Sequence, residues 1–232
     1  MVSMALGPNE WAAILLSLQV AVVATVSSIP IAVLVAYALA RWSFPGRALL
    51  NGLVHLPLVL PPVVTGYLLL LSMGTQGPIG GLLAEIGIVF AFRWTGAALA
   101  AAVMAFPLMV RAIRLQIESI DPQYEQAAAT LGASPRWVFW TVSFPLMLPG
   151  IVVGSILAFA KAMGEFGATI TFVSNIPGQT QTIPSAIYAF LQVPGKEDAA
   201  MALVMISVTI SMLALLFSEL IARKVGRQQG GL

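Results

Sequence analysis

The sequence predicts an all-helical integral membrane protein with about five transmembrane helices in a single domain over residues 1–232. Of the 232 residues, 59% are apolar and 9% are charged, whereas charged residues make up about a quarter of a soluble domain. So few charges cannot cover a water-facing exterior without large apolar patches. Five apolar stretches also approach the roughly 20 residues that a helix needs to cross the hydrocarbon core.

The five stretches differ in how they are interrupted. In chain order they are residues 11–40, 49–73, 95–110, 146–173 and 199–218. The first is uncharged and Pro30 predicts a kink in it, since proline removes a helical hydrogen bond. Prolines 57, 61 and 62 crowd the second, the third is the shortest, and Lys161 and Glu165 interrupt the fourth. Residues 74–92 are less apolar and are predicted to form an interfacial loop with a short helix.

The basic residues predict the orientation. Five spans place alternate loops on opposite sides, and Lys161 lies within a span. One side receives Arg41, Arg47, Arg111, Arg114, Arg136, Arg223, Lys224 and Arg227, and the other receives Arg93 and Lys196. Cytoplasmic loops are enriched in Lys and Arg, so we expect the amino terminus outside and the carboxyl terminus in the cytoplasm. Residues 111–136 are then cytoplasmic and residues 174–198 external.

Several kinds of chemistry are not expected. The chain has no cysteine and one histidine, His55, which removes disulfides, thiolate nucleophiles and a histidine-built metal centre. His55 is predicted to be a hydrogen-bonded structural residue. No phosphate-binding loop of the form G-x-x-x-x-G-K-[ST] occurs. We therefore expect neither an enzyme nor a cofactor site.

Residues 121–145 form a distinctive polar segment. Asp121 can cap a helix that has Pro122 in its first turn, and Gly132 suits the left-handed position that ends a helix. Ser134 and Pro135 repeat the cap and first-turn pattern. The segment is thus predicted to be a helix, a glycine turn and a second helix. Physical reasoning alone allows either a docking surface for another protein or an amphipathic hairpin lying on the membrane.

The same segment resembles the cytoplasmic signature loop of ABC importer permeases, which reads Glu-Ala-Ala, three residues, Gly, nine residues, Ile-x-Leu-Pro. Gln126-Ala127-Ala128, Gly132 and Val142-x-Phe144-Pro145 occupy these positions. Gln126, Val142 and Phe144 depart from the pattern, and Glu125 lies one position out of register. The resemblance implies that this loop seats in a cleft of an ATPase subunit. The expected coupling residues are Glu125, Gln126, Ala127, Ala128, Gly132 and Pro145.

Other stretches are similar to the molybdate branch of these permeases, parts of which sulfate and tungstate permeases share. They are residues 55–70, 106–115, 164–178 and 182–188. The resemblance implies a bacterial inner-membrane permease that pairs with a second copy, two ATPase subunits that hold ATP and Mg, and a periplasmic oxyanion-binding protein. No cofactor on this chain and no nucleic-acid partner are expected. A sulfate or tungstate permease remains an alternative, and an ion-coupled transporter or a membrane enzyme would need more intramembrane ionisable residues than are present.

Two groups of residues are candidates for the transport path. Lys161 and Glu165, four residues apart, lie on one helical face, where charges either neutralise each other structurally or face a cavity. Pro61, Pro62 and Thr65 would offer free carbonyls and a hydroxyl to a pore, or a kink needed only for packing. The spacing of Gly150 and Gly154 permits close helix contact.

The external loop is polar and nearly uncharged. The resemblance implies that the periplasmic partner docks on this face. The candidate contacts are Asn175, Gln179, Gln181 and Thr182, with an ordinary solvated loop as the alternative for each of them.

Overall fold

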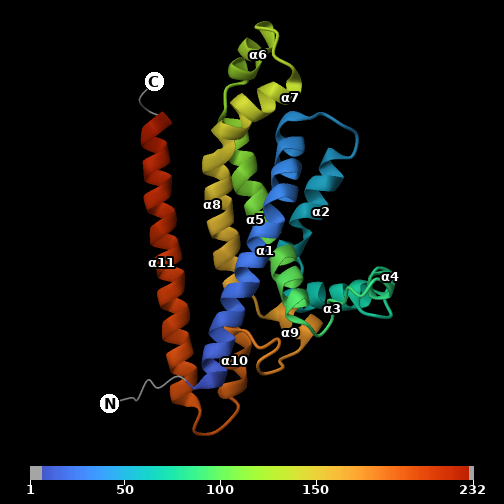
Figure 1. The fold of residues 1–232 in the computed structure, drawn as a ribbon, viewed down its shortest axis with the longest axis vertical. Coiled ribbons are helices and arrows are strands. Elements are labelled where there is room, and N and C mark those ends of the chain that lie inside the picture. The colour runs from blue at the N-terminus through green and yellow to red at the C-terminus, as the bar shows by residue number, and fades with distance from the viewer. Residues whose placement is uncertain (1–6, 230–232) are drawn as a thin grey trace.

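The structure, a computed structural model, describes residues 7–229, and the side chains of 215 and 217–229 lie outside this description. Every regular element in the described range is helical (Figure 1). The elements are α1 (Pro8–Arg41), α2 (Arg47–Val59), α3 (Pro62–Met73), α4 (Gly80–Glu85), α5 (Trp94–Ser119), α6 (Pro122–Thr130), α7 (Pro135–Val138), the π-helix η1 (Phe139–Ser143), α8 (Phe144–Met163), α9 (Gly167–Val173), α10 (Ile183–Phe190) and α11 (Glu197–Gln229).

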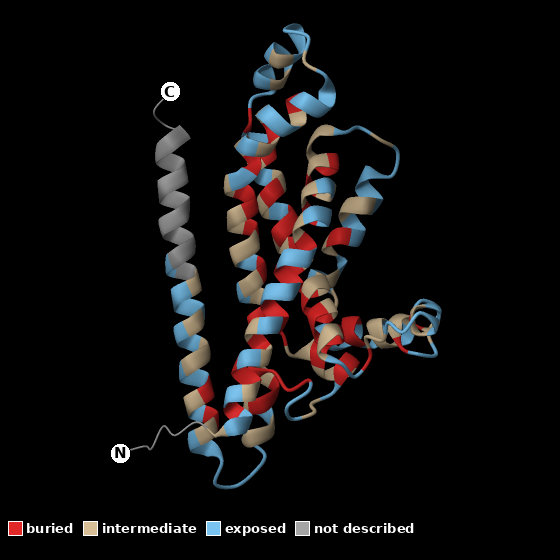
Figure 2. Cartoon of the chain, in the orientation of Figure 1, coloured by how far each residue is buried: buried red, intermediate tan, exposed pale blue. Residues whose placement is uncertain are grey.

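Helices α1, α5 and α8 form the core of an elongated bundle. Small side chains allow this close packing: Ala24 and Ala36 of α1 and Ala97 and Ala101 of α5 are at most 1% exposed. Their buried faces turn toward one another in Figure 2. Alanine at a helix interface lets two backbones approach, which gains dispersion contacts where lipid offers no hydrophobic driving force.

The predicted membrane architecture is confirmed. Within residues 7–229, four helices are long and apolar enough to cross a membrane, and the bent pair α2 and α3 makes a fifth if counted as one span. The two halves of that pair meet at 116°. In Figure 1, α3 runs across the long axis of the bundle. Pro61 and Pro62 sit at the bend, where their missing N–H groups interrupt the helix.

Two predicted span boundaries are wrong, and a predicted loop contains a helix. The fourth span ends at Met163, and α9 begins only at Gly167. The third span continues as α5 to Ser119, because arginines near a helix end extend their charged groups to the interface while the backbone stays helical. The external segment contains a helix, α10, whose capping box pairs Thr182 with Ser185.

The glycine pair of α8 packs inside the chain. A Cβ on Gly150 would collide with Gln116 of α5, and one on Gly154 would lie 3.0 Å from the carbonyl oxygen of Met109. The close contact that the spacing predicts is therefore made by α5.

The bundle has two chemically distinct ends. Helices α6 and α7 lie at one end, with the carboxyl end of α1 and the start of α2, while α9, α10 and the start of α1 lie toward the other (Figure 1). Arg41 ends α1 and Arg47 begins α2, so both belong to the α6 end. The side chains of Arg223, Lys224 and Arg227 lie outside the described residues. His55 makes the predicted hydrogen bond, with Nδ1 2.8 Å from the carbonyl oxygen of Asn51.

Candidate functional site

The segment between α5 and α8 has the predicted helix, turn and helix. Asp121 caps α6 by accepting a hydrogen bond from the Gln123 N–H at 2.9 Å, and the Ser134 hydroxyl accepts one from the Trp137 N–H at 3.4 Å. Gly132 adopts a φ of 85°, which a side chain would strain. These local interactions fix the shape of the segment without contacts from the bundle.

Glu125 fastens α6 to the bundle. Its Oε1 accepts a hydrogen bond from the Ser143 hydroxyl of η1 at 2.8 Å, and its Oε2 lies 3.6 Å from Nε of Arg41. Arg41 also donates to the carbonyl oxygen of Ile120 at 3.0 Å, just before α6. We call Arg41, Ile120, Glu125 and Ser143 the anchor. It connects α6 to both α1 and α8, so a force on α6 reaches two core helices.

The opposite face of α6 is an exposed apolar stripe. Tyr124 is 60% exposed, Ala127 is exposed, and Leu131 just after the helix is 88% exposed. Positions separated by three and four residues lie on one side of a helix. A leucine this exposed at the tip of a projecting helix gains nothing for the fold, and apolar side chains presented in this way mark contact sites for other proteins.

Most of the predicted coupling residues are exposed, and they lie on α6, in the turn after it and at the start of α8. Gln126, Ala127, Gly132 and Pro145 are exposed, and Ala128 is half-buried. Glu125, one position out of register with the family pattern, faces the bundle through the anchor.

Besides the bend between α2 and α3, a second helix break lies between the end of α8 at Met163 and the start of α9 at Gly167. Lys161 Nζ donates to Glu165 Oε2 at 2.9 Å, and Glu165 Oε1 accepts from the Ala168 N–H at 3.0 Å. The Glu165 side chain is 2% exposed, whereas that of Lys161 is 32% exposed. The two predicted partners therefore meet, but Glu165 lies beyond the end of the helix. Two donors satisfy the buried carboxylate, as a charge at membrane depth requires.

The two helix breaks lie against each other. A Cβ on Gly167 would lie 2.7 Å from Pro62 Cβ, and one on Gly66 would collide with the carbonyl oxygen of Ala168. Helices α3 and α9 thus pack with almost no space between their backbones. The structure brings the bend at Pro61 and Pro62 next to the Lys161–Glu165 pair, which are far apart in sequence. Pro61 and Pro62 are exposed.

Thr65 is placed at this junction as a buried hydroxyl. The residue is 6% exposed, and its Oγ1 has no hydrogen-bond partner among the described residues. A buried hydroxyl without a partner costs free energy. The next residue of α3, Gly66, is the position that packs against α9.

The polar residues after α9 serve mainly to order their own loop. Gln181 and Thr182 are 5% and 4% exposed, and Thr182 belongs to the α10 capping box. The Ser17 hydroxyl accepts a 2.7 Å hydrogen bond from the Ile183 N–H and so ties α10 to α1. Of the four candidate contacts, Gln179 is exposed and Asn175 is half-buried.

Comparison with known proteins identifies the family. The profile of the family described as "Binding-protein-dependent transport system inner membrane component" matches residues 28–227. The chain belongs to this family. The match includes α6, the anchor and both helix breaks.

Similar permeases are known from several bacteria. The "Molybdenum transport system permease protein ModB" of Escherichia coli K12 is 58% identical over 230 residues, which are 98% of this chain and 100% of that protein. Its namesake in Haemophilus influenzae is 53% identical over 95% of this chain and 97% of its own length. The permease fold resembles that of a bacterial alginate ABC transporter solved "in complex with alginate pentasaccharide-bound periplasmic protein". That match has a TM-score of 0.73 at 19% identity and covers 94% of this chain and 80% of the other.

Sequence reasoning missed the partners of Glu125. Arg41 is 84 positions away and Ser143 is 18 away, and neither belongs to the family pattern. The sequence did offer one indication of the Arg41 partner. Arg41 ends the first span and was predicted to lie on the same side of the membrane as residues 121–145. Tyr124 and Leu131 could have been found from their spacing, because they share a helical face with Ala127.

Proposed function

We propose that this permease is the membrane subunit of an ATP-driven molybdate importer that works by alternating access. The observation that carries the proposal is the exposed α6 stripe of Tyr124, Ala127 and Leu131. The Glu125 anchor attaches the helix that bears this stripe to the bundle. High similarity to molybdenum permeases along nearly the whole chain supports the substrate. A sulfate or tungstate importer is the alternative, since those anions share the tetrahedral, doubly negative form of molybdate.

Two ATPase subunits, which hold ATP and Mg, would bind at the α6 end. ATP-driven closure of these partners would push the stripe and, through Arg41 and Ser143, move α1 and α8 together. Basic residues at this end, Arg41, Arg47 and Arg136, support a cytoplasmic location by the positive-inside rule. The amino terminus of α1 would then face the periplasm.

The transport path would pass the junction of α3 and α9. Interrupted helices packed together at membrane depth offer unpaired backbone groups to a substrate. Lys161, Glu165, Thr65 and the Pro61–Pro62 bend would line or gate this path. One bundle of this size does not enclose a channel, so a second copy would provide the other wall, related by twofold symmetry.

The periplasmic partner would dock at the α10 end. Gln179, which is exposed, and Asn175, which is half-buried, remain candidate contacts because part of each side chain reaches the surface. Gln181 and Thr182 are buried, and they would support the loop that presents these two residues. Substrate choice would then rest largely with the periplasmic oxyanion-binding protein.

The experiment is reconstitution of the permease with its ATPase and periplasmic binding protein in vesicles. We expect uptake of radioactive molybdate that requires ATP and all three components, with weaker competition by sulfate than by unlabelled molybdate. Deleting residues 127–132 should abolish copurification of the ATPase. Uptake by the permease alone, or an undiminished complex after the deletion, would contradict the proposal. Preferred uptake of sulfate would leave the importer but change the anion.

A further inference from the structure

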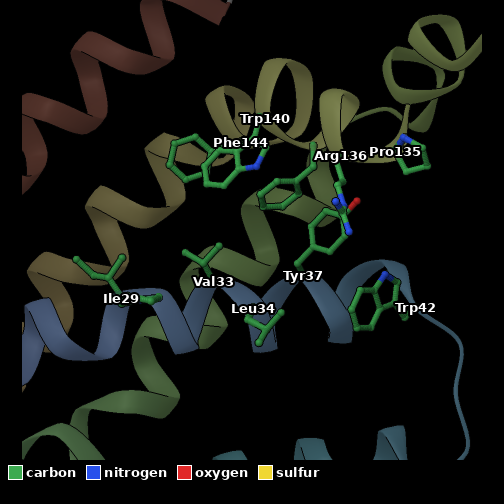
Figure 3. A pocket seen from close by; sticks show the side chains of 11 residues that line it. Ile29, Val33, Leu34, Tyr37, Trp42, Pro135, Arg136, Trp140 and Phe144 are labelled. Carbon is green, nitrogen blue, oxygen red and sulfur yellow. The ribbon is translucent and has the colours of Figure 1, made fainter. Parts of the chain in front are cut away.

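An apolar groove runs along the side of the bundle at the α6 end. It has a volume of about 670 Å³ and lies between the second half of α1, from Ile29 to Trp42, and the segment from Pro135 to Phe144 (Figure 3). The second wall is formed by α7, η1 and the first residue of α8. This second wall follows α6 in the chain. A molecule that fills the groove therefore contacts the segment that connects α6 to the bundle.

Aromatic contacts hold the walls in place. The Tyr37 ring packs edge-on against Phe139 at 5.2 Å between centroids and against Trp42 at 6.2 Å. Trp140 packs edge-on against Phe139 at 5.2 Å. Edge-to-face pairs of this kind stabilise a fixed geometry. The groove is therefore preformed and does not need an occupant to open it.

The length of the groove corresponds to one membrane leaflet. Ile29 and Trp42 are 13 positions apart on α1, which at 1.5 Å per residue gives about 20 Å. Half of a bilayer, including its headgroups, is also about 20 Å thick. Leu34, about midway along the groove, is 60% exposed. An apolar side chain at this depth is in contact with hydrocarbon.

Arg136 places a positive charge at the outer end of the groove, between two tryptophans. Arg136 is exposed and has no salt bridge among the described residues, whereas Arg41 at the same end pairs with Glu125. Trp42 and Trp140 are 52% and 63% exposed. Tryptophan favours the headgroup level of a bilayer, and a guanidinium binds phosphate through two parallel hydrogen bonds.

We infer that this groove binds an anionic phospholipid, with an acyl chain along α1 and the headgroup phosphate on Arg136. An apolar floor of one leaflet's length and the Arg136 guanidinium at headgroup level match the two parts of such a molecule. The bound lipid joins α1 to α7, so it steadies the segment that carries α6. This inference does not depend on which anion the permease transports.

The binding test uses native mass spectrometry of the purified permease complex. We expect phosphatidylglycerol to bind about tenfold more tightly than phosphatidylcholine, because the choline ammonium of the latter neutralises the phosphate and weakens its charge-assisted contact with Arg136. Arg136→Gln should remove this preference. Arg93→Gln, an exposed arginine at the opposite end, is the matched control and should keep it. Equal binding of the two lipids by the wild type, or equal losses in both variants, would overturn the inference.

A cysteine placed in the groove distinguishes lipid from protein. The chain has no natural cysteine, so Leu34→Cys introduces a single thiol at the exposed middle of the groove. We expect this thiol to react with a membrane-embedded maleimide lipid and to form no disulfide between copies. An efficient disulfide under mild oxidation would show that a second copy occupies the groove and would overturn the lipid assignment.

Discussion

Replacing Glu125 with Gln tests whether α6 must be fastened to the bundle. The substitution keeps the size of the side chain and an acceptor for the Ser143 hydroxyl, but it removes the negative charge that lies 3.6 Å from Arg41. Arg41 keeps its hydrogen bond to the Ile120 carbonyl. The predicted result is an α6 that remains helical, because its caps are local, but that is less firmly positioned.

The geometry sets the size of the effect. The Arg41 and Glu125 side chains are 16% and 21% exposed, so water screens their attraction only in part. At an effective dielectric constant of about 20, charges at this distance attract by about 4–5 kcal/mol before desolvation is subtracted. Desolvation cancels much of this. Weakening a charge-assisted hydrogen bond to a neutral one removes about half of its roughly 1.5–3 kcal/mol. We expect a net loss of about 2 kcal/mol.

A loss of this size corresponds to up to about 30-fold weaker binding of the ATPase subunit, because 1.4 kcal/mol is a factor of ten. The assay is titration of the detergent-solubilised permease with purified ATPase, followed by ATP hydrolysis stimulated by the loaded binding protein. Glu118→Gln is the matched control, since Glu118 pairs with Arg114 at 2.7 Å on α5 and does not touch α6. An affinity for Glu125→Gln within about twofold of the wild type, with stimulation unchanged, would refute the anchor as we describe it.

Three further substitutions test the other parts of the permease. Leu131→Glu should change the free energy of unfolding by no more than about 0.5 kcal/mol, since the side chain is 88% exposed. It should weaken ATPase binding about tenfold or more, which a pull-down would measure. Lys161→Ala should lower ATP-driven uptake by roughly tenfold, the effect of one lost charge contact, while the complex still copurifies; unchanged uptake would remove Lys161 from the path. Gly66→Ala should destabilise the fold by about 1–3 kcal/mol through its collision with α9. Thermal unfolding would measure this, with Gly52→Ala, which meets nothing within 4 Å, as the control that should behave like the wild type.

The positions of the spans and of the α6–α7 segment can be predicted from local sequence patterns. Apolar length identifies membrane helices, because a helix must cross about 30 Å of hydrocarbon with few charged residues. Asp121, Gly132 and Ser134 determine α6 and α7 through hydrogen bonds and backbone conformations that involve only neighbouring residues. The family pattern adds the expected partner surface.

The breaks in the second and fourth spans were only partly predictable. Proline and glycine mark positions where a helix is weak, as at Pro61 and Gly164, but they do not say how far the chain turns. The 116° bend between α2 and α3 depends on α9 packing against Gly66. The local sequence around Pro61 gives no information about that contact.

The sequence by itself determined the membrane class, the helical composition and the helix–turn–helix that projects from the bundle, because hydropathy and capping act over a few residues. The tertiary structure decided which side chains meet: Glu125 with Arg41 and Ser143, Pro62 with Gly167, and Tyr37 with Phe139 in the groove. These contacts join segments up to 105 positions apart, as for Pro62 and Gly167. Such partners depend on the angles between whole helices, and those angles result from packing summed over the entire bundle.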